Sequence, residues 1–207
     1  MTTIHDAPPV SADDALTRLI QGNERFVAGH ARFPTVQKDV LAELAKAQQP
    51  FATIIGCSDS RVPPELVFDA GFGDLFIIRL AGNVISAEVM GTLQYAGVHL
   101  RTALFVVLGH EGCGAVQAAL AAKWDGAKER SRIATLLDGI IPGLPNHRDD
   151  QSPEEQMHAA VEANVRWSMR QVRETPEAKA RLAEGVLKLV GAVYELKSGH
   201  VRFLPAE

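Results

Sequence analysis

The segment Phe51-Ala52-Thr53-Ile54-Ile55-Gly56 is a short, nearly uninterrupted apolar run that ends at Cys57. Such runs are typical of parallel strands buried on both faces of a sheet. Two similar runs follow, at residues 74–80 and 102–109, and the second ends at His110. A helical pattern over residues 86–100 separates them, with Ser86 as a suitable N-cap. This alternation predicts an α/β fold with a mostly parallel β-sheet flanked by helices.

The remaining segments predict an N-terminal helical arm and a C-terminal edge hairpin. Apolar spacing indicates helices over residues 12–28 and 36–47, which pack either on the main body or on a neighbouring subunit. Residues 123–153 hold prolines, glycines and mixed charges and are expected to form an irregular surface excursion. Helical patterns return at 153–174 and 177–182, and 185–203 indicates two strands joined by a turn at Ser198-Gly199. We expect one domain over 1–207, with the arm at 12–47 and the α/β core at 51–204.

Composition narrows the class of protein. The chain has 207 residues, of which 46% are hydrophobic and 22% charged, as in an ordinary globular protein. Its net charge of −4 is unlike the basic surface that binds nucleic acid. No apolar run approaches the ~18 residues of a membrane span, and residues 1–11 do not resemble a signal peptide. A cytoplasmic location is expected because both cysteines are assigned to a metal and none is left for a disulfide.

Cys57 and Cys113 are the only cysteines, and with His110 they form an incomplete set of tetrahedral zinc ligands. Structural zinc sites use four protein ligands, whereas catalytic sites leave one position for water or substrate. Cys57 and His110 both follow strands, and ligands bind at the carboxyl ends of parallel strands, so the two should meet in space. A helix starting at Gly114 would place Cys113 at its N-terminus, where a thiolate is favoured. A disulfide is the alternative, but it leaves His110 unexplained.

Asp59 and Arg61 lie close to the first cysteine. Asp59 could either ligate the metal or accept a hydrogen bond from a zinc-bound hydroxide, and a bidentate pair with Arg61 could decide between these states. The guanidinium would lower the carboxylate pKa and keep it ionised. The alternative is a solvated turn with a surface ion pair. A metal, an open position, an acid and a cation together indicate hydrolytic or hydration chemistry.

The segments Cys57-Ser-Asp59-Ser-Arg61 and His110-x-x-Cys113-Gly114 resemble those of the β-class carbonic anhydrases. Residues 22–26 (Gly-Asn-x-Arg-Phe) and 79–83 (Arg-x-Ala-Gly-Asn) are also similar, and the resemblance covers residues 12–204.

The resemblance implies one zinc ion per chain, held by Cys57, His110 and Cys113. It implies reversible hydration of CO₂ to bicarbonate and a proton, through attack by a zinc-bound hydroxide that the catalytic pair Asp59 and Arg61 positions. Asp59 is a fourth ligand in the closed, inactive form of some members. The family further implies a homodimer or higher homo-oligomer with the active site near the subunit interface.

Within the family, the chain is similar to the plant-like branch rather than the bicarbonate-inhibited branch. That similarity implies substrate-binding roles for Gln48, Phe76, Ala81, Tyr95 and Gly114, with Gln48 acting from the second subunit. Core packing is the alternative for Phe76, Tyr95, Ala81 and Gly114, and above all for Phe76.

Two departures from the family pattern bear on regulation and on the metal-binding segment. The inhibited branch has a tryptophan where this chain has Ile54, although Arg79 and Tyr194 match the rest of its inhibitory pocket. We therefore expect no strong bicarbonate-driven closure. Glu111 stands where Ser or Thr is commoner in the family, and its carboxylate adds negative charge near the metal.

His99 is a candidate proton shuttle, because it lies one helical turn after Tyr95 and an imidazole titrates near neutral pH. Three other functions stay open. The first is a related zinc hydrolase acting on CS₂ or COS. The second is a non-enzymatic binding or assembly module, against which the intact Asp59, Arg61 and Gln48 argue. The third is a structural zinc domain with Asp59 as a permanent ligand.

Overall fold

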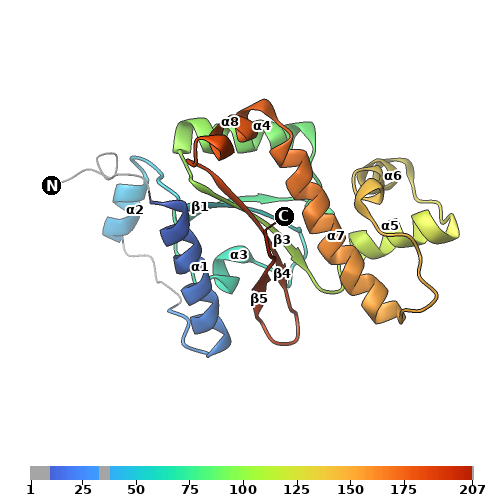
Figure 1. Ribbon diagram of the computed structural model, residues 1–207. Helices are drawn as coiled ribbons and strands as arrows, with labels where there is room; N and C mark the ends of the chain where they lie inside the picture. Colours follow the sequence, from blue (N-terminus) through green and yellow to red (C-terminus); the bar gives the residue numbers. More distant parts are fainter. Residues whose placement is uncertain (1–9, 33–37, 207) are drawn as a thin grey trace.

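A five-stranded sheet forms the centre of the protein in the computed structural model, which describes residues 10–32 and 38–206. The strand order is β2-β1-β3-β4-β5 (Figure 1). The strands are β1 (Ala52–Gly56), β2 (Leu75–Arg79), β3 (Leu104–His110), β4 (Lys188–Tyr194) and β5 (Val201–Phe203). The first four are parallel, and β5 pairs antiparallel with β4. The mostly parallel sheet and the C-terminal hairpin are thus as predicted.

The strands that carry the candidate ligands lie in the interior of the sheet. Every residue of β1 and β3 is buried, which agrees with their continuous apolar sequences. The register pairs Gly56 of β1 with Leu108 of β3. Cys57 and His110 therefore leave the sheet at the same edge, as predicted.

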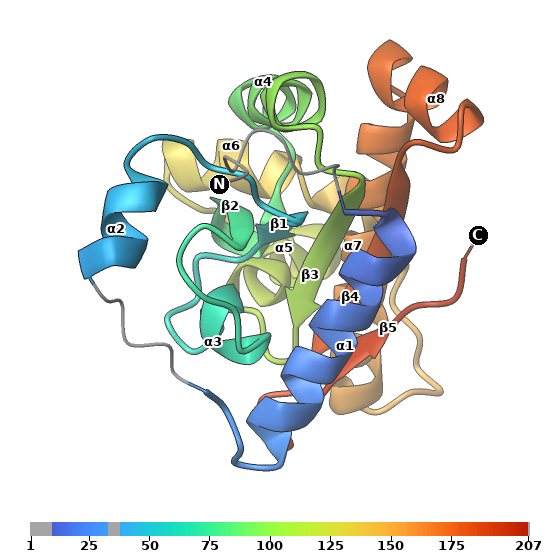
Figure 2. The ribbon, with the colours of Figure 1, turned by 90° about the vertical axis from the view of Figure 1, so that its left-hand side faces the viewer.

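Helices cover both faces of the sheet, because successive strand side chains point to opposite sides. Ile54 packs with residues of α1 (Ala12–Val27) and α3 (Pro64–Val67) on one face. Ile55 packs on the other face with α4 (Ala87–Tyr95), α5 (Gly114–Asp125) and α7 (Pro153–Arg173). Figures 1 and 2 show α1 along one side of the strands and α7 along the other.

Local sequence signals account for the starts of several helices. The side chain of Ser86 accepts a hydrogen bond from the amide of Val89, and the π-helix η3 (Ala96–Leu100) continues α4, so the expected helix over 86–100 is confirmed. Ser152 and Glu155 form a reciprocal capping box at the start of α7. The short helix α8 (Pro176–Ala183) follows it, and η2 (Ala81–Asn83) follows β2.

The prediction of an irregular excursion over 123–153 was wrong in part. This stretch contains α6 (Ser131–Asp138) and the 3₁₀ turn η4 (Ile141–Gly143). Leu137 and Ile140 are buried there, at 2% and 0% exposed. The glycines and prolines mark the ends of these short elements, and buried apolar side chains hold the elements on the core.

The helical arm divides into two parts. Helix α1 packs on its own chain, since Ala15 and Leu19 are 0% exposed and the Asn23 side chain donates to the carbonyl oxygen of Val67. Helix α2 (Lys38–Leu44) stands apart from the sheet (Figure 2). The first two residues of the expected second helix, 36 and 37, lie outside the described residues. No helix within the described ranges is long and apolar enough to cross a membrane.

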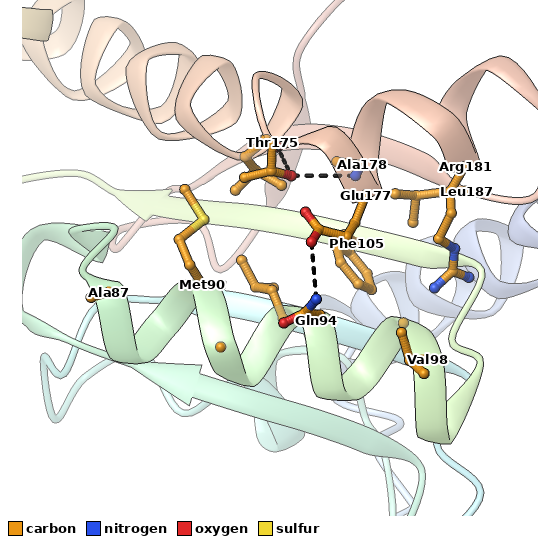
Figure 3. A pocket seen from close by; sticks show the side chains of 14 residues that line it. Ala87, Met90, Gln94, Val98, Phe105, Thr175, Glu177, Ala178, Arg181 and Leu187 are labelled. Atoms are coloured by element: carbon orange, nitrogen blue, oxygen red, sulfur yellow. Dashed lines mark hydrogen bonds between the residues drawn. The ribbon is translucent and has the colours of Figure 1, made fainter.

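A cavity of about 360 Å³ lies between α4 and α8 (Figure 3). Its floor includes Phe105, near the start of β3, and Leu187, just before β4. Gln94 bridges it by donating a hydrogen bond to Glu177, with 2.9 Å between Nε2 and Oε1. The cavity is therefore near the amino ends of the strands, and none of the three candidate ligands lines it.

Candidate metal centre

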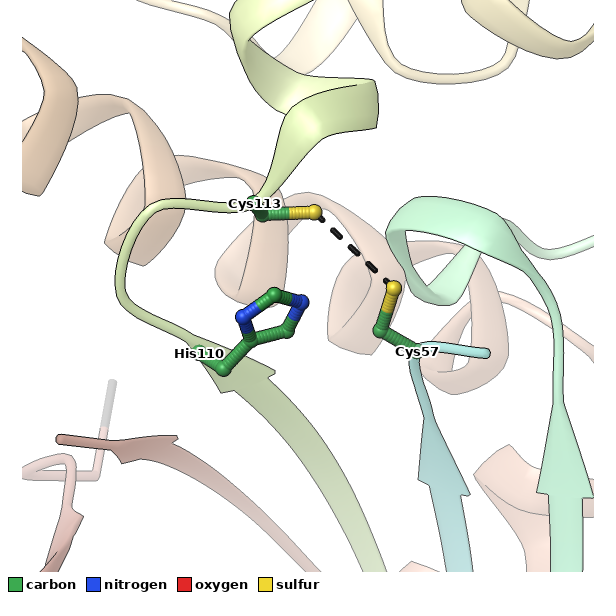
Figure 4. Close-up of side chains that lie close together, drawn as sticks. All are labelled: Cys57, His110 and Cys113. Atoms are coloured by element: carbon green, nitrogen blue, oxygen red, sulfur yellow. Dashed lines mark hydrogen bonds between the residues drawn. The ribbon is translucent and has the colours of Figure 1, made fainter. Parts of the chain in front are cut away.

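Three side chains converge at the carboxyl edge of the sheet. Cys57 directly follows β1, His110 ends β3, and Cys113 is the N-cap of α5. Their ligand atoms lie within 4.8 Å of one another, and the residues are 5%, 1% and 2% exposed. Figure 4 shows the two sulfurs and the imidazole facing a common point. Among the described residues, this is the one cluster of His, Cys, Asp and Glu that meets this criterion.

The orientation of the His110 ring suits metal binding. Nδ1 lies 2.9 Å from the carbonyl oxygen of Glu111 and must donate to it, since a carbonyl oxygen is only an acceptor. Nε2 is then an acceptor, and it is buried without a hydrogen-bond partner. A buried polar atom in that state is costly unless something binds it. A divalent ion at the centre of the group would satisfy Nε2.

The two cysteines are free thiols rather than a disulfide. Their sulfurs are 4.0 Å apart, about twice the length of an S–S bond. The hydrogen bond from Cys113, with a smaller contribution from the Gly82 amide, lowers the pKa of Cys57 despite its burial. The same sulfur contact, together with burial, raises the pKa of Cys113. The contact thus favours the ionised form of Cys57 and the protonated form of Cys113, and binding a metal to both sulfurs would displace the protons that remain on them.

A buried polar network holds the turn that contacts Cys57. The amide of Gly82 donates to the Cys57 sulfur at 3.3 Å. Asn164 of α7 donates to the carbonyl oxygen of Gly82 at 2.8 Å. Ser168, one turn further along α7, accepts from the Asn83 side chain at 3.1 Å and donates to the Asn83 carbonyl oxygen at 3.0 Å. Asn164, Ser168 and Asn83 are at most 2% exposed. Because these buried bonds hold the Gly82-Asn83 backbone, α7 fixes the direction of the N–H···S contact.

Sequence reasoning missed this network. Two signals for it were available. Gly82-Asn83 is a dipeptide that favours positive φ, and both residues adopt it, at 64° and 46°. Asn164 and Ser168 are polar residues at helical spacing on the buried face of α7.

Asp59 and Arg61 form the predicted bidentate pair. Arg61 donates from Nε to Oδ1 at 2.9 Å and from Nη2 to Oδ2 at 2.8 Å. The guanidinium holds the pKa of Asp59 far below its usual range, so the carboxylate is ionised at neutral pH. Oδ2 is 3.8 Å from Nε2 of His110, yet Asp59 is not part of the 4.8 Å ligand cluster. The carboxylate thus stands beside the three ligands.

Arg79 supports the same loop through its backbone. It donates from Nε to the carbonyl oxygen of Cys57 at 2.8 Å and from Nη2 to that of Asp59 at 2.6 Å. Arg79 is the last residue of β2 and pairs in register with Gly56, which places it beside the loop. Its guanidinium therefore acts as a brace between two neighbouring strand ends.

The structure brings some of the other candidate residues to the ligands and leaves others apart. Ala81 lies next to Gly82, and Gly114 follows Cys113 with open space where a Cβ would be. Phe76, Tyr95 and His99 form a separate row, with ring centroids 6.2 Å and 5.0 Å apart.

Gln48 is exposed in the segment before β1, and Tyr95 is 46% exposed. Within the described part of the chain, no hydrogen bond or ring contact joins Gln48, Tyr95 or His99 to the ligand group. These side chains are therefore not assembled around the ligands of their own chain.

Comparison with known proteins agrees with this geometry. A family model described as carbonic anhydrase matches residues 52–201, which contain all three candidate ligands. The chain belongs to the β-class carbonic anhydrase family. It is 40% identical over 197 residues to carbonic anhydrase 2 of Mycobacterium tuberculosis, covering 92% of this chain and 90% of the relative. The chain is accordingly an enzyme of the carbonic anhydrase type.

Solved structures of β-carbonic anhydrases share the fold. The β-carbonic anhydrase CcaA matches with a TM-score of 0.73 and 28% identity, over 91% of this chain and 94% of that one. A chain from a study of two tetrameric β-carbonic anhydrases of Sordaria macrospora matches with a TM-score of 0.73 over 93% and 98% of the two chains. Its identity of 23% supports the fold alone.

Proposed function

We propose that this chain catalyses the zinc-dependent, reversible hydration of CO₂ to bicarbonate and a proton. The observation that carries the proposal is the convergence of Cys57, His110 and Cys113 beside an ionised Asp59. Two sulfurs and an imidazole nitrogen suit zinc, and three protein ligands leave a fourth position open. A zinc ion bound there supplies a water acidified enough to act as a nucleophile near neutral pH.

Asp59 would orient that nucleophile. Its Oδ2 is the carboxylate oxygen within 3.8 Å of His110 Nε2, and an ionised carboxylate can only accept hydrogen bonds. Accepting a hydrogen bond from the nucleophile at Oδ2 would turn an oxygen lone pair toward CO₂. Arg61 engages both carboxylate oxygens, which favours a position beside the metal over direct coordination. CO₂ is nonpolar and needs few polar contacts. The small residues Ala81 and Gly114 would leave room for it beside the metal.

We further propose that the active unit is a homodimer or a larger homo-oligomer. Gln48 and Tyr95 are exposed and have no link to their own ligand group, so the ligand group of a second subunit is their expected target. Val98, beside Tyr95, is 56% exposed and would be covered in the same contact.

We also propose that the chain follows the plant-like branch and lacks bicarbonate-driven closure. Ile54 is 0% exposed in the sheet at the position of the tryptophan of the inhibited branch. Arg79 already donates to two backbone carbonyl groups, which limits its capacity to bind bicarbonate. A crystal structure at neutral pH with Asp59 on zinc would count against this proposal.

The test is stopped-flow CO₂ hydration between pH 6 and 9, on wild type and Asp59→Ala with their zinc contents quantified. We expect one zinc per chain in both proteins and turnover in the wild type alone. A zinc-loaded wild type that does not hydrate CO₂ would indicate a structural zinc domain. Turnover of CS₂ or COS in preference to CO₂, measured in parallel, would indicate the related hydrolase instead.

A further inference from the structure

We propose that Glu111 is a positioning residue that clamps the metal-binding turn to the β4–β5 hairpin and thereby sets the orientation of the His110 ring. The inference rests on the proposed function, because it concerns a proposed zinc ligand. Glu111 is the residue between His110 and Gly112, and its backbone and side chain both make contacts that bear on the ring.

The backbone of Glu111 holds the imidazole directly. Its carbonyl oxygen accepts the hydrogen bond from Nδ1 of His110 at 2.9 Å, which leaves Nε2 for the metal. Its amide donates to the carbonyl oxygen of Tyr194 at 3.0 Å and so continues the β3–β4 ladder by one residue. Gly112 follows with φ of 59°, so the chain turns away immediately afterwards. The direction of the Glu111 carbonyl therefore decides the direction of the ring.

The side chain of Glu111 makes a second attachment to the same hairpin. Its Oε2 accepts a hydrogen bond from the amide of Leu196 at 3.0 Å. Leu196 lies beyond Tyr194, the last residue of β4, so the carboxylate provides an acceptor where the ladder has ended. The other oxygen, Oε1, is 3.6 Å from Nε2 of His158 on α7. The Glu111 side chain is only 28% exposed, which strengthens these contacts relative to fully solvated ones.

The β4–β5 hairpin is itself held in place by hydrogen bonds from α1 to its turn and to β5. The amide nitrogen of the Asn23 side chain donates to the carbonyl oxygen of Gly199 at 2.8 Å. The side-chain oxygen of Asn23 accepts from the amide of Val201, also at 2.8 Å. Asn23 is 5% exposed, so water competes little for these bonds. Hydrogen bonds thus join α1 to the hairpin, the hairpin to Glu111 and Glu111 to the imidazole.

Loss of the carboxylate should loosen the ring without unfolding the protein. The Leu196 amide would turn to water, and residue 111 would be attached to the hairpin only through its backbone amide bond to Tyr194. Partners that orient a metal ligand are typically worth 10–100-fold in metal affinity. An uncharged amide of the same shape would still accept from Leu196, so the hydrogen bond and the charge can be separated.

The experiment compares Glu111→Ala with Glu111→Gln, and uses His158→Gln as the control for the neighbouring charge. Zinc affinity is measured by chelator competition, and amide hydrogen exchange at Leu196 is followed in the metal-free protein. For Glu111→Ala we expect a loss of affinity of about 10–100-fold and faster exchange at Leu196. Glu111→Gln and His158→Gln should keep a zinc affinity within about threefold of wild type, which is a smaller change than the about 10–100-fold typical of losing a residue that orients a ligand.

Three results would overturn the proposal. Glu111→Ala could keep wild-type affinity and exchange. Glu111→Gln could lose as much as Glu111→Ala, which would assign the effect to charge. The melting temperature of the metal-free alanine variant could fall enough to explain its weaker binding, which would make the role merely structural. The failure of this proposal can be told apart from the failure of the proposed function. A wild-type protein that binds zinc but does not hydrate CO₂ would refute the proposed function, and the role of Glu111 could still be measured as zinc affinity. A wild type that hydrates CO₂, with a Glu111→Ala variant of unchanged zinc affinity, would refute the role of Glu111 alone.

Discussion

The metal-binding edge of the sheet and the row of Phe76, Tyr95 and His99 differ in how completely one chain builds them. At the edge, three ligands are at most 5% exposed, and backbone and side-chain hydrogen bonds hold them from several elements. Along the row, Tyr95 is 46% exposed and lies between the rings of Phe76 and His99. A single chain therefore assembles the candidate ligand group by itself, whereas under the proposed function a second subunit would cover the exposed row.

Removing a ligand should have the largest effect on the metal edge. Cys57→Ser or Cys113→Ser replaces a thiolate by a hydroxyl, a far poorer zinc ligand, and we expect zinc content and CO₂ hydration to fall to background. Ser58→Ala is the matched control, since Ser58 is exposed in the same loop. Metal analysis with an activity assay decides the matter. A Cys57→Ser protein that retains stoichiometric zinc would show that the ligand set is misassigned.

Asp59→Asn should lower turnover by about 10²-fold while zinc stays bound, because the amide places N–H donors where the carboxylate only accepts, so the nucleophile is no longer oriented. Stopped-flow kinetics on zinc-quantified protein measures this. A variant that loses its zinc would instead identify Asp59 as a ligand.

The pH dependence of CO₂ hydration separates the role of Asp59 from that of Arg61. The pKa of Asp59 is depressed, so the carboxylate is ionised above that pKa and its stabilising contribution is lost only as the pH falls through it. Arg61→Gln should raise this pKa toward the usual value of about 3.9, still well below neutrality. We expect the CO₂ hydration rate to fall at every pH between 6 and 9. The inflection of the pH–rate profile near neutral pH should stay where it is in the wild type. An inflection shifted by a full unit would mean that Asp59 titrates in that range.

The proposed subunit contact beside the exposed row can be disrupted without changing any metal ligand. Val98→Asp places a charge in the proposed subunit contact, and desolvating an unpaired carboxylate costs several kcal/mol, so we expect association to weaken by about 10–100-fold or more. Analytical ultracentrifugation should show dissociation, with lower activity and unchanged zinc content. Val186→Asp is the control, since Val186 is 48% exposed outside this row. Equal effects of both substitutions would remove the support for a specific contact.

The difference between the two regions also explains what could be predicted from the sequence. Cys57 and His110 were placed correctly because each ends an apolar strand, and parallel strands bring such ends to one edge. The pairing of Asp59 with Arg61 is a contact between near neighbours in the chain, so it too could be predicted. Helix α6 was missed because glycines and prolines around it masked its short apolar pattern.

The support from α7 was harder to predict. Asn164 and Ser168 reach Gly82 and Asn83 only because α7 returns across the sheet, more than 80 residues later in the chain. The local signals at each segment mark a turn and a pair of buried polar residues, but they do not identify the partner of either. The exposure of Tyr95 was equally out of reach, since apolar spacing cannot tell a core-facing side chain from one that meets a second subunit.

Ser168→Ala tests the buried network at the metal edge. The Asn83 side chain would lose its acceptor, and leaving a buried polar group unpaired costs about 1–3 kcal/mol of unfolding free energy. Denaturant unfolding measures this, with Thr135→Ala, which removes an exposed hydroxyl, as the matched control. If both variants unfolded like the wild type, the network would contribute nothing to holding the Gly82 turn.

His99→Ala should have the smallest effect. His99 stacks on Tyr95 at 5.0 Å and is exposed, so it could pass protons to solvent. We expect turnover to fall only a few-fold, against the ~10²–10⁴-fold typical of a direct acid–base group, only in low buffer, and to recover with added imidazole. Unchanged turnover in low buffer would end the shuttle assignment.

The most direct test of the central claim is zinc X-ray absorption spectroscopy on the reduced protein, recorded with and without iodide. The account predicts two sulfurs near ~2.3 Å and two lighter ligands near ~2.0 Å, one of which iodide displaces. A spectrum that iodide leaves unchanged, or a protein that binds no zinc, would contradict a site with an exchangeable position.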